Sequence, residues 1–205
     1  MTYYTADTHL GHANIILYTG RPFLKPGDLT KEGKWVSPEI AKERCAVMDK
    51  TIINNINQRV KEDDTLIIDG DFCFSHSTEA SEAPKKPFDY YRVQIKCKNV
   101  IIIQGNHDNN NLTKTNLQKL IIRQGGKRIC IVHNPEHADI HYEINFTGHV
   151  HQLWKFKRIR VGVDFTDCIN VGTDMNNFYP ITINEILSEY SKWIKGIIDE
   201  KGRRK

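Results

Sequence analysis

The chain has 205 residues, of which 29 are Lys or Arg and 25 are Asp or Glu, giving a net charge of +4, and 39% of its residues are hydrophobic. These values are typical of a soluble globular protein, and no apolar run approaches the roughly 20 residues that span a bilayer. The first residues show no basic stretch followed by an apolar one, so we expect no signal peptide. We therefore expect one domain over residues 1–205, in the cytoplasm and without a membrane partner.

Five cysteines are scattered through the chain without a Cys-x-x-Cys pair: Cys45, Cys73, Cys97, Cys130 and Cys168. Their odd number and their spacing argue against a disulfide framework or a cysteine zinc site and favour a reducing compartment. Cys73 lies two residues after an acidic motif, and we expect it to be a small buried core residue rather than part of a site.

The first half of the chain alternates strand-like and helix-like segments. A short β-prone stretch at residues 2–6 precedes a long loop at residues 13–37, with one helical turn expected at 14–18. Ser37-Pro38-Glu39 is typical of a helix start, and apolar residues at near-helical spacing predict a helix over residues 38–59. An apolar run predicts a strand at residues 65–68, and the following polar, Pro-containing residues 75–87 predict a loop.

The second half becomes mostly strand-like. In chain order we expect a helix at 88–98, a buried strand at 100–103, a helix at 112–122 that ends before Gly125-Gly126, and strands at 128–132, 143–147, 158–163 and 167–171. The clearest helix spans about residues 183–200, where apolar residues form one stripe that packs on the domain. Residues 201–205 form a basic tail that we expect to be frayed.

Alternating strands and helices followed by strands predict an α/β fold with two layers or a sandwich. The early strands are continuous apolar runs, which are typical of strands covered on both faces. In such sheets the loops at the carboxyl ends of the strands hold the active site. Five motifs follow segments of this kind: Asp7-Thr8-His9, Gly70-Asp71, Gly105-Asn106-His107-Asp108, His133-Asn134 and Gly148-His149-Val150-His151.

The five motifs together supply carboxylate, carboxamide and imidazole groups for two adjacent metal ions. Two neighbouring metals suit an in-line displacement at phosphorus, so the series predicts a metal-dependent phosphoesterase. Asp7 and His9 are two positions apart, which places both side chains on one side of an extended backbone, and His149 and His151 repeat this spacing. Taken alone, an Asp-x-His pattern or a single histidine such as His133 is more often structural. The occurrence of all five motifs in one order, each after a strand, favours the metal site.

Asp71 and the Gly105–Asp108 motif carry the most specific chemistry. Asp71 has two carboxylate oxygens and is the natural bridge between two cations, and Asn106 offers a neutral oxygen ligand. His107 would lie beside a bound phosphate, where it would stabilise the charged oxygens or protonate the leaving oxygen, and Asp108 would orient its ring. The alternatives are an ordinary Asp-Gly-Asp turn and an Asn-rich polar loop.

The series D-x-H, GD, GNHD, H and GHxH resembles the calcineurin-like metallophosphoesterase superfamily. Residues 7–16, Arg21-Pro22-Phe23 and Gly70-Asp71-Phe72 are further similar to small phage and bacterial members, and a viral protein would act in the host cytoplasm. Some relatives place Asp or His three residues after the bridging Asp, where this chain has Phe74. The resemblance implies a sandwich of two β-sheets flanked by helices, with the site at the carboxyl ends of strands.

The resemblance also implies ligands for two divalent ions. Asp7, His9, Asp71 and His151 would hold the first ion, and Asp71, Asn106, His133 and His149 the second. It implies a metal-bridging hydroxide as nucleophile and His107 as acid or charge stabiliser. Manganese is the family's frequent metal, and oxygen and imidazole ligands without thiolate also suit iron, zinc, nickel or cobalt.

Two residues outside the ligand set are candidates for substrate contacts. Arg21, in the long loop, would grip a substrate phosphate bidentately. His12 would contact the phosphate or support a ligand from behind, and we favour the second. The loops at 17–37 and 74–87 are expected to shape substrate choice.

We expect hydrolysis of a phosphodiester or phosphomonoester in a nucleotide or at a nucleic-acid end, by a monomer or homodimer. A nuclease acting on longer DNA or RNA is an alternative, motivated by the basic residues 155–160 and 201–205. Both clusters are more simply a solvated hairpin face and a frayed terminus. A non-catalytic binding scaffold is the third possibility, and the complete ligand set disfavours it.

Overall fold

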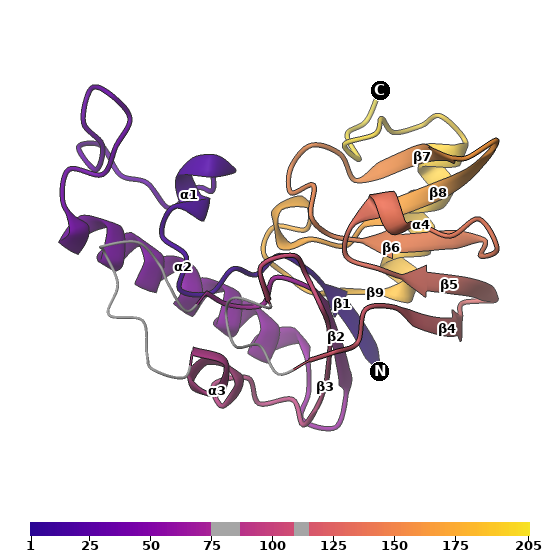
Figure 1. The fold of residues 1–205 in the computed structure, drawn as a ribbon, viewed down its shortest axis with the longest axis horizontal. Helices are drawn as coiled ribbons and strands as arrows, with labels where there is room; N and C mark the ends of the chain where they lie inside the picture. The colour runs from indigo at the N-terminus through magenta and orange to yellow at the C-terminus, as the bar shows by residue number, and fades with distance from the viewer. Residues whose placement is uncertain (75–86, 109–114) are drawn as a thin grey trace.

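Two β-sheets pack against each other, and helices pack against them (Figure 1). The computed structural model describes residues 1–74, 87–108 and 115–205. The first sheet has the order β3-β2-β1-β9, formed by β1 (Thr2–Thr5), β2 (Thr65–Asp69), β3 (Asn99–Ile103) and β9 (Ile181–Thr182). The second has the order β4-β5-β6-β8-β7, formed by β4 (Leu120–Gln124), β5 (Lys127–Ile131), β6 (Ile144–Thr147), β7 (Phe156–Val161) and β8 (Asp164–Asn170). The helices are α1 (Ile15–Tyr18), α2 (Pro38–Arg59), α3 (Pro87–Arg92) and α4 (Ile183–Ile194).

The central strands of both sheets are parallel, which positions the site. β1 pairs in parallel with β2, and β2 with β3, while β5, β6 and β8 form a second parallel set. Parallel neighbours end at the same edge of a sheet, so the segments that follow β1, β2 and β3 emerge together. The motif-bearing segments after β5 and β6 emerge in the same way from the second sheet.

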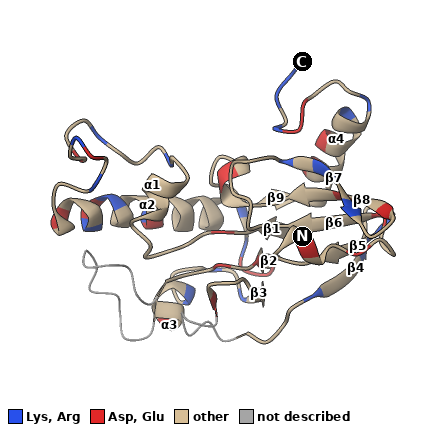
Figure 2. Cartoon of the chain, turned by 45° about the horizontal axis from the view of Figure 1, so that its top comes forward, with Lys and Arg blue, Asp and Glu red and all other residues tan. Residues whose placement is uncertain are grey.

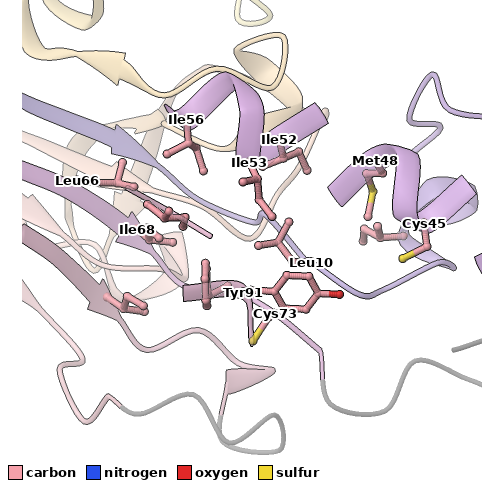
Figure 3. Close-up of a cluster of buried hydrophobic side chains, with 14 of the residues drawn as sticks. Leu10, Cys45, Met48, Ile52, Ile53, Ile56, Leu66, Ile68, Cys73 and Tyr91 are labelled. Carbon is pink, nitrogen blue, oxygen red and sulfur yellow. The ribbon is translucent and has the colours of Figure 1, made fainter. Parts of the chain in front are cut away.

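The long helix α2 covers the first sheet. It begins where the Ser37 hydroxyl accepts a hydrogen bond from the Ile40 N–H at 3.3 Å, with proline at the first helical position. Its buried residues Ile52 and Ile56 belong to the same hydrophobic cluster as Leu66 and Ile68 of β2 (Figure 3). The expected helix over residues 38–59 is confirmed.

A second core lies between the sheets. Tyr4 of β1 meets Phe146 of β6 edge to face, with ring centroids 5.1 Å apart and both residues fully buried. Ile67 of β2 joins this core, whereas its neighbours Leu66 and Ile68 point into the helix-covered core. Burial on both faces explains why β2 is a continuous apolar run. The predicted α/β sandwich of two sheets with flanking helices is confirmed.

The helix expected at 112–122 is wrong. Residues 112–114 lie outside the described part of the chain, residues 115–119 form no regular element, and β4 begins at Leu120. β4 pairs antiparallel with β5 across Gly125 and Gly126, which both have positive φ. A glycine pair between two β-prone segments is a hairpin signal, and this turn chemistry outweighs the helical spacing.

The helices expected at 88–98 and 183–200 are shorter than predicted. α3 ends at Arg92, whose guanidinium binds the carbonyl oxygens of Ile95 and Cys97 in the chain that follows. α4 ends at Ile194 because Gly196 adopts a φ of 69°, a left-handed conformation that commonly ends helices.

The C-terminal tail folds back and is not frayed as expected. Arg203 pairs with Asp199 at 2.6 Å, and Ile198 forms an isolated β-bridge with Arg204. The strands expected between residues 128 and 171 are present as β5 to β8. The loop expected at 75–87 lies outside the described residues, except for Pro87, which begins α3.

All five cysteines are buried and none forms a disulfide, and Cys73 belongs to the helix-covered core, as predicted. Among the residues that the structure describes, no helix combines the length and apolar character needed to cross a membrane.

Candidate metal centre

Most of the backbone strain in the described chain falls on predicted metal ligands. Seven non-glycine residues there have positive φ, and five of them are Asp7, His9, Asp71, His149 and His151, with φ between 46° and 70°. This left-handed conformation costs of order 1–3 kcal/mol for a residue with a side chain, and it persists only where the surroundings fix it. Such clustering is typical of functional sites.

Hydrogen bonds between the loops after β1 and β2 fix this backbone. The Asp7 N–H donates to the Gly70 carbonyl at 3.1 Å, and the His9 N–H donates to the Asp71 carbonyl at 2.9 Å. The Thr8 hydroxyl donates to the Phe72 carbonyl at 2.6 Å. The parallel pairing therefore continues past the ends of the strands and holds the first two motifs against each other.

The carboxylate of Asp71 lies close to one histidine from each of the two predicted ligand sets. Its Oδ2 is 3.6 Å from His9 Nε2 and 3.4 Å from His133 Nε2. Candidate ligand atoms of Asp7, His9 and His151 lie within 4.8 Å of one another, and so do those of Asp7, Asp71 and His133. The two groups share Asp7, so two cations held there would be neighbours.

Asn106 completes the second group. Its Oδ1 lies 3.2 Å from His133 Nε2 and 2.9 Å from His149 Nδ1. His133 Nδ1 must carry a proton because it donates to the Asp69 carbonyl at 2.7 Å, which leaves Nε2 to face Asn106 and Asp71. A hydrogen bond of this kind on the far nitrogen is what fixes metal-ligating histidines in proteins.

The donor set fits divalent cations. The His9 Nε2 atom is buried and has no hydrogen-bond partner, although such orphaned polar atoms are rare and costly. The atoms that surround it are carboxylate oxygens and imidazole nitrogens, which suit manganese, iron or zinc. A cation at this position would satisfy the His9 nitrogen and the neighbouring carboxylates together.

Buried carboxylates are stable in their charged form only when positive charge lies nearby, and the carboxylates of this site are buried. Burial raises the pKa of Asp7 to about 6, against the lowering influence of His133. Burial by itself would lower the pKa of His133, but its contact with Asp71 and the charges of Asp7 and Asp71 raise it to about 10. Without a metal, the extra proton on His133 supplies the charge that the carboxylates need. A divalent cation would take over that role, with His133 as a neutral ligand.

Asp174 contacts the candidate ligand His151 and is a residue that sequence reasoning missed. Its Oδ2 accepts a hydrogen bond from His151 Nδ1 at 2.8 Å, and its side chain is only 4% exposed. With Nδ1 engaged in this way, Nε2 is the nitrogen of His151 left for a cation. Asp174 lies in the short 3₁₀ helix Thr173–Met175, which carries no recognisable motif.

The structure does not place Arg21 for the predicted contact with a substrate phosphate, because its guanidinium is engaged inside the protein. It is 2% exposed, and its guanidinium binds the Asp174 carboxylate in a bidentate manner, with Nε 2.8 Å and Nη2 3.1 Å from the two oxygens. It also donates to the carbonyl oxygens of Asp7 and Thr8, at 2.6 and 3.1 Å. Arg21 therefore supports the strained backbone of the first motif and holds the partner of His151.

Asp108 acts on the backbone around the bridging ligand. Its carboxylate accepts hydrogen bonds from the N–H groups of Asp71, Phe72 and Gly105, at 2.9, 3.2 and 2.7 Å. The expectation that it orients the His107 ring stays a prediction. The His107 N–H donates to Asp71 Oδ1 at 3.0 Å, so the third motif also positions the carboxylate of the second.

His12 lies beside His9, and the expectation that it supports a ligand from behind stays a prediction. The two Nδ1 atoms are 3.5 Å apart, and the His12 ring stacks on Phe74 with centroids 3.9 Å apart. Burial, followed by the charges of His107 and Arg21, lowers the pKa of His12 to about 4, so the ring is neutral near pH 7. His9, His12, His107, His149 and His151 all line one open cavity of about 350 Å³.

Replacing Gly105 with alanine should disrupt the centre. An added Cβ would overlap the Asp71 carboxylate and lie 2.5 Å from its backbone nitrogen. We expect Gly105→Ala to lose at least about tenfold in metal affinity, measured by calorimetric titration of manganese. Gly162→Ala is the control, because nothing lies within 4 Å of its added Cβ, although its φ of 66°, unlike that of Gly105, is itself unfavourable for a side chain. Equal metal affinity in the two variants would contradict this placement of Asp71.

Removing the charge of Asp174 should weaken one ion selectively. We expect Asp174→Asn to lower the affinity of one of two manganese ions by about 10- to 100-fold, because His151 loses its charged partner. Calorimetric titration resolves the two binding steps, and thermal unfolding of the metal-free variant reports any general loss of structure. Asp167→Asn, which alters a buried carboxylate paired with Arg158 in the second sheet, is the matched control. Equal weakening of both ions would contradict a specific role at His151.

Comparison with known proteins places the fold. No model of a known protein family matches the sequence. The uncharacterised protein MJ1445 of Methanocaldococcus jannaschii is 27% identical over 206 residues, covering 96% of both chains. The crystal structure of AQ665 from Aquifex aeolicus, a protein of unknown function, superposes with a TM-score of 0.56 at 22% identity, covering 92% of this chain and 98% of that one. A structure described as a novel archaeal phosphodiesterase matches with a TM-score of 0.38 at 15% identity, covering 83% of this chain and 82% of that one.

The match to AQ665 extends over nearly the whole chain. The chain shares the fold of that protein, an α/β sandwich of two mixed β-sheets, and its candidate metal ligands lie at the carboxyl ends of the strands.

Proposed function

We propose that this protein is a dinuclear metal-dependent phosphoesterase that hydrolyses a phosphodiester or phosphomonoester of a nucleotide or nucleic-acid end. The observation that carries the proposal is the position of Asp71 Oδ2, between His9 Nε2 and His133 Nε2 at 3.6 and 3.4 Å. A carboxylate in that position is suited to bridging two cations. Phosphoryl transfer is the reaction that such a pair of ions best supports.

The chain's own residues would divide the work as follows. Asp7, His9 and His151 would join Asp71 at one ion, and Asn106, His133 and His149 would join it at the other. When bound, two divalent ions, with manganese the first choice, would neutralise the phosphate and lower the pKa of water. The hydrogen bonds from the His149 N–H to both Asp7 oxygens, at 3.1 and 2.9 Å, would keep that carboxylate oriented throughout.

His107 is proposed as the proton donor or charge stabiliser. Its ring lines the cavity beside the ligand groups, while its backbone N–H is held by Asp71 at 3.0 Å. The backbone of His107 is therefore fixed to the bridging ligand, and its ring borders the cavity in which an ester would lie. From there it would donate a proton to the leaving oxygen or a hydrogen bond to the phosphate.

The second candidate, a nuclease on long DNA or RNA, depends on the basic cluster at 155–160. Figure 2 shows basic residues on β7. Lys155 is 8% exposed and pairs with Glu189 at 2.5 Å, and Arg158 pairs with Asp167 at 2.7 Å. These partners reduce the charge that the cluster offers to a polyanion, which favours a smaller substrate. Activity on oligonucleotides that falls steeply with added salt would support the nuclease instead.

The first test is manganese-dependent hydrolysis of bis-p-nitrophenyl phosphate, comparing the unaltered protein with Asp71→Asn. We expect the substitution to cut kcat/KM at least about 100-fold, because an amide lacks the second anionic oxygen needed to bridge two cations. Metal content is measured in parallel. An inactive unaltered protein would argue for a strict monoesterase or a binding scaffold, and p-nitrophenyl phosphate then separates these two.

Alanine at His107 should separate chemistry from metal binding. We expect His107→Ala to bind manganese as before and to lose about 10²- to 10⁴-fold in kcat, the usual range for a general acid. His137→Ala, a change on the short 3₁₀ helix Pro135–His137, serves as control. Unchanged turnover in His107→Ala would refute its assigned role.

A further inference from the structure

A row of aromatic rings leads from the proposed reaction centre to the protein surface. The His107 and Phe74 ring centroids are 5.0 Å apart, Phe74 stacks on His12 at 3.9 Å, and the His12 and Tyr18 rings form a T-shaped contact with centroids 6.0 Å apart. The row begins at the ring proposed to act on the leaving oxygen. It ends at Tyr18, which is 69% exposed.

The outer end of this row borders the cavity at the metal centre. Besides the histidines, the cavity of about 350 Å³ is lined by the apolar or aromatic residues Ile15, Tyr18, Val150 and Leu153. Leu153 is 65% exposed. Neither it nor Tyr18 has a part in holding metal ions, so two large apolar side chains face solvent at the mouth of a polar centre.

Tyr18 stands on an anchored element. It ends α1, whose Ile15 and Ile16 are buried in the helix-covered core. The Trp35 indole N–H donates to the Asn14 side-chain oxygen at 3.0 Å, just before the helix. The ring of Tyr18 is thereby presented to the cavity on a fixed backbone, which reduces the entropy lost when a ligand binds against it.

The charges around the cavity favour an uncharged group beside the metal centre. Among the described residues that line it, the ionisable side chains are histidines and Tyr18, and lysine and arginine are absent. A second phosphate or a long anionic strand would find no permanent cation there in the described chain. A flat, uncharged group would instead find an aromatic ring and aliphatic walls.

We propose that this cavity binds a planar aromatic group of the substrate, stacked on Tyr18 and flanked by Leu153, while the phosphate lies at the metal centre. The inference rests on the proposed phosphoesterase function and specifies its substrate class as esters with a nucleobase or another aromatic ring. Stacking of a base on an aromatic side chain is tolerant of base identity. Tyr18 is thus a specificity-determining residue.

The test is calorimetric binding of three phosphonates to the manganese-loaded protein. Phenylphosphonate and cyclohexylphosphonate have similar size, but only the first has a planar ring, and methylphosphonate has neither. We expect phenylphosphonate to bind at least about tenfold more tightly than the other two. In Tyr18→Ala the phenyl-to-methyl affinity ratio should fall to near one, and in Tyr18→Phe it should be retained.

Tyr90→Ala is the matched control, because Tyr90 is 53% exposed and lies outside the residues that line the cavity. A second pair of ligands identifies the source of the ring. Adenosine 5′-monophosphate binding more tightly than ribose 5-phosphate, with the difference lost in Tyr18→Ala, would indicate a nucleotide. An advantage for phenylphosphonate without one for the nucleotide would indicate a smaller aryl ester.

The outcomes separate this inference from the function on which it rests. If the protein hydrolyses bis-p-nitrophenyl phosphate but binds all three phosphonates equally, the aromatic site is refuted and the phosphoesterase stands. The same holds if Tyr18→Ala and Tyr90→Ala have equal phenyl-to-methyl ratios. If the manganese-loaded protein neither hydrolyses the ester nor binds any phosphonate, both proposals are overturned.

Discussion

The buried carboxylates of Asp7 and Asp71 impose the constraint on which the rest of the site depends. They are 0% and 2% exposed, and they share a small volume with the imidazoles of His9 and His133. Burying two negative charges so close together is costly unless positive charge accompanies them. In the metal-free protein, backbone N–H groups and a protonated His133 meet this need in part. The arrangement is one that gains stability when divalent cations bind, because they replace a proton with greater charge at the same place.

At the edge of the two sheets where this centre lies, strained backbone conformations occur together with glycines that leave room for the ligands. The loops after β1 and β2 remain hydrogen-bonded to each other, which holds Asp7, His9 and Asp71 in left-handed conformations. Glycine at position 148 leaves room where a Cβ would lie 2.7 Å from Asp7 Oδ2. Strained ligands and glycines without side chains both allow oxygen and nitrogen atoms from five separate segments to converge at one place.

The clustering of the candidate ligands could be predicted from the sequence, because residue type, spacing and position after apolar strands indicate it. Asp174 could not, because it follows no strand-end motif and its importance lies in its contact with His151. Arg21 was misassigned for a similar reason: an arginine in a loop resembles a phosphate ligand, whereas its partner Asp174 lies 153 positions away. The helix predicted over residues 112–122 was wrong for a local reason. The apolar pattern there is compatible with a helix or a strand, and the Gly-Gly turn favours the β-hairpin that forms. The spacing of residues in the sequence therefore did not predict two things, namely side-chain pairs between distant residues and the geometry of a turn.

The contacts of buried Arg21 explain how the candidate metal ligands and α1, which carries Tyr18, keep their relative positions. Its guanidinium binds Asp174 and the carbonyls of Asp7 and Thr8, while its own N–H donates to the Ile16 carbonyl of α1 at 3.0 Å. Arg21 therefore joins the helix that presents Tyr18, through its backbone N–H, to the first metal motif and to the partner of His151, through its guanidinium. Movement of α1 relative to the metal ligands would strain these hydrogen bonds, and breaking the buried charged bonds to the carbonyls of Asp7 and Thr8 is costly. The cavity wall and the metal centre consequently behave as one unit, so a substrate ring that stacks on that wall would hold its phosphate at a defined distance from the ions.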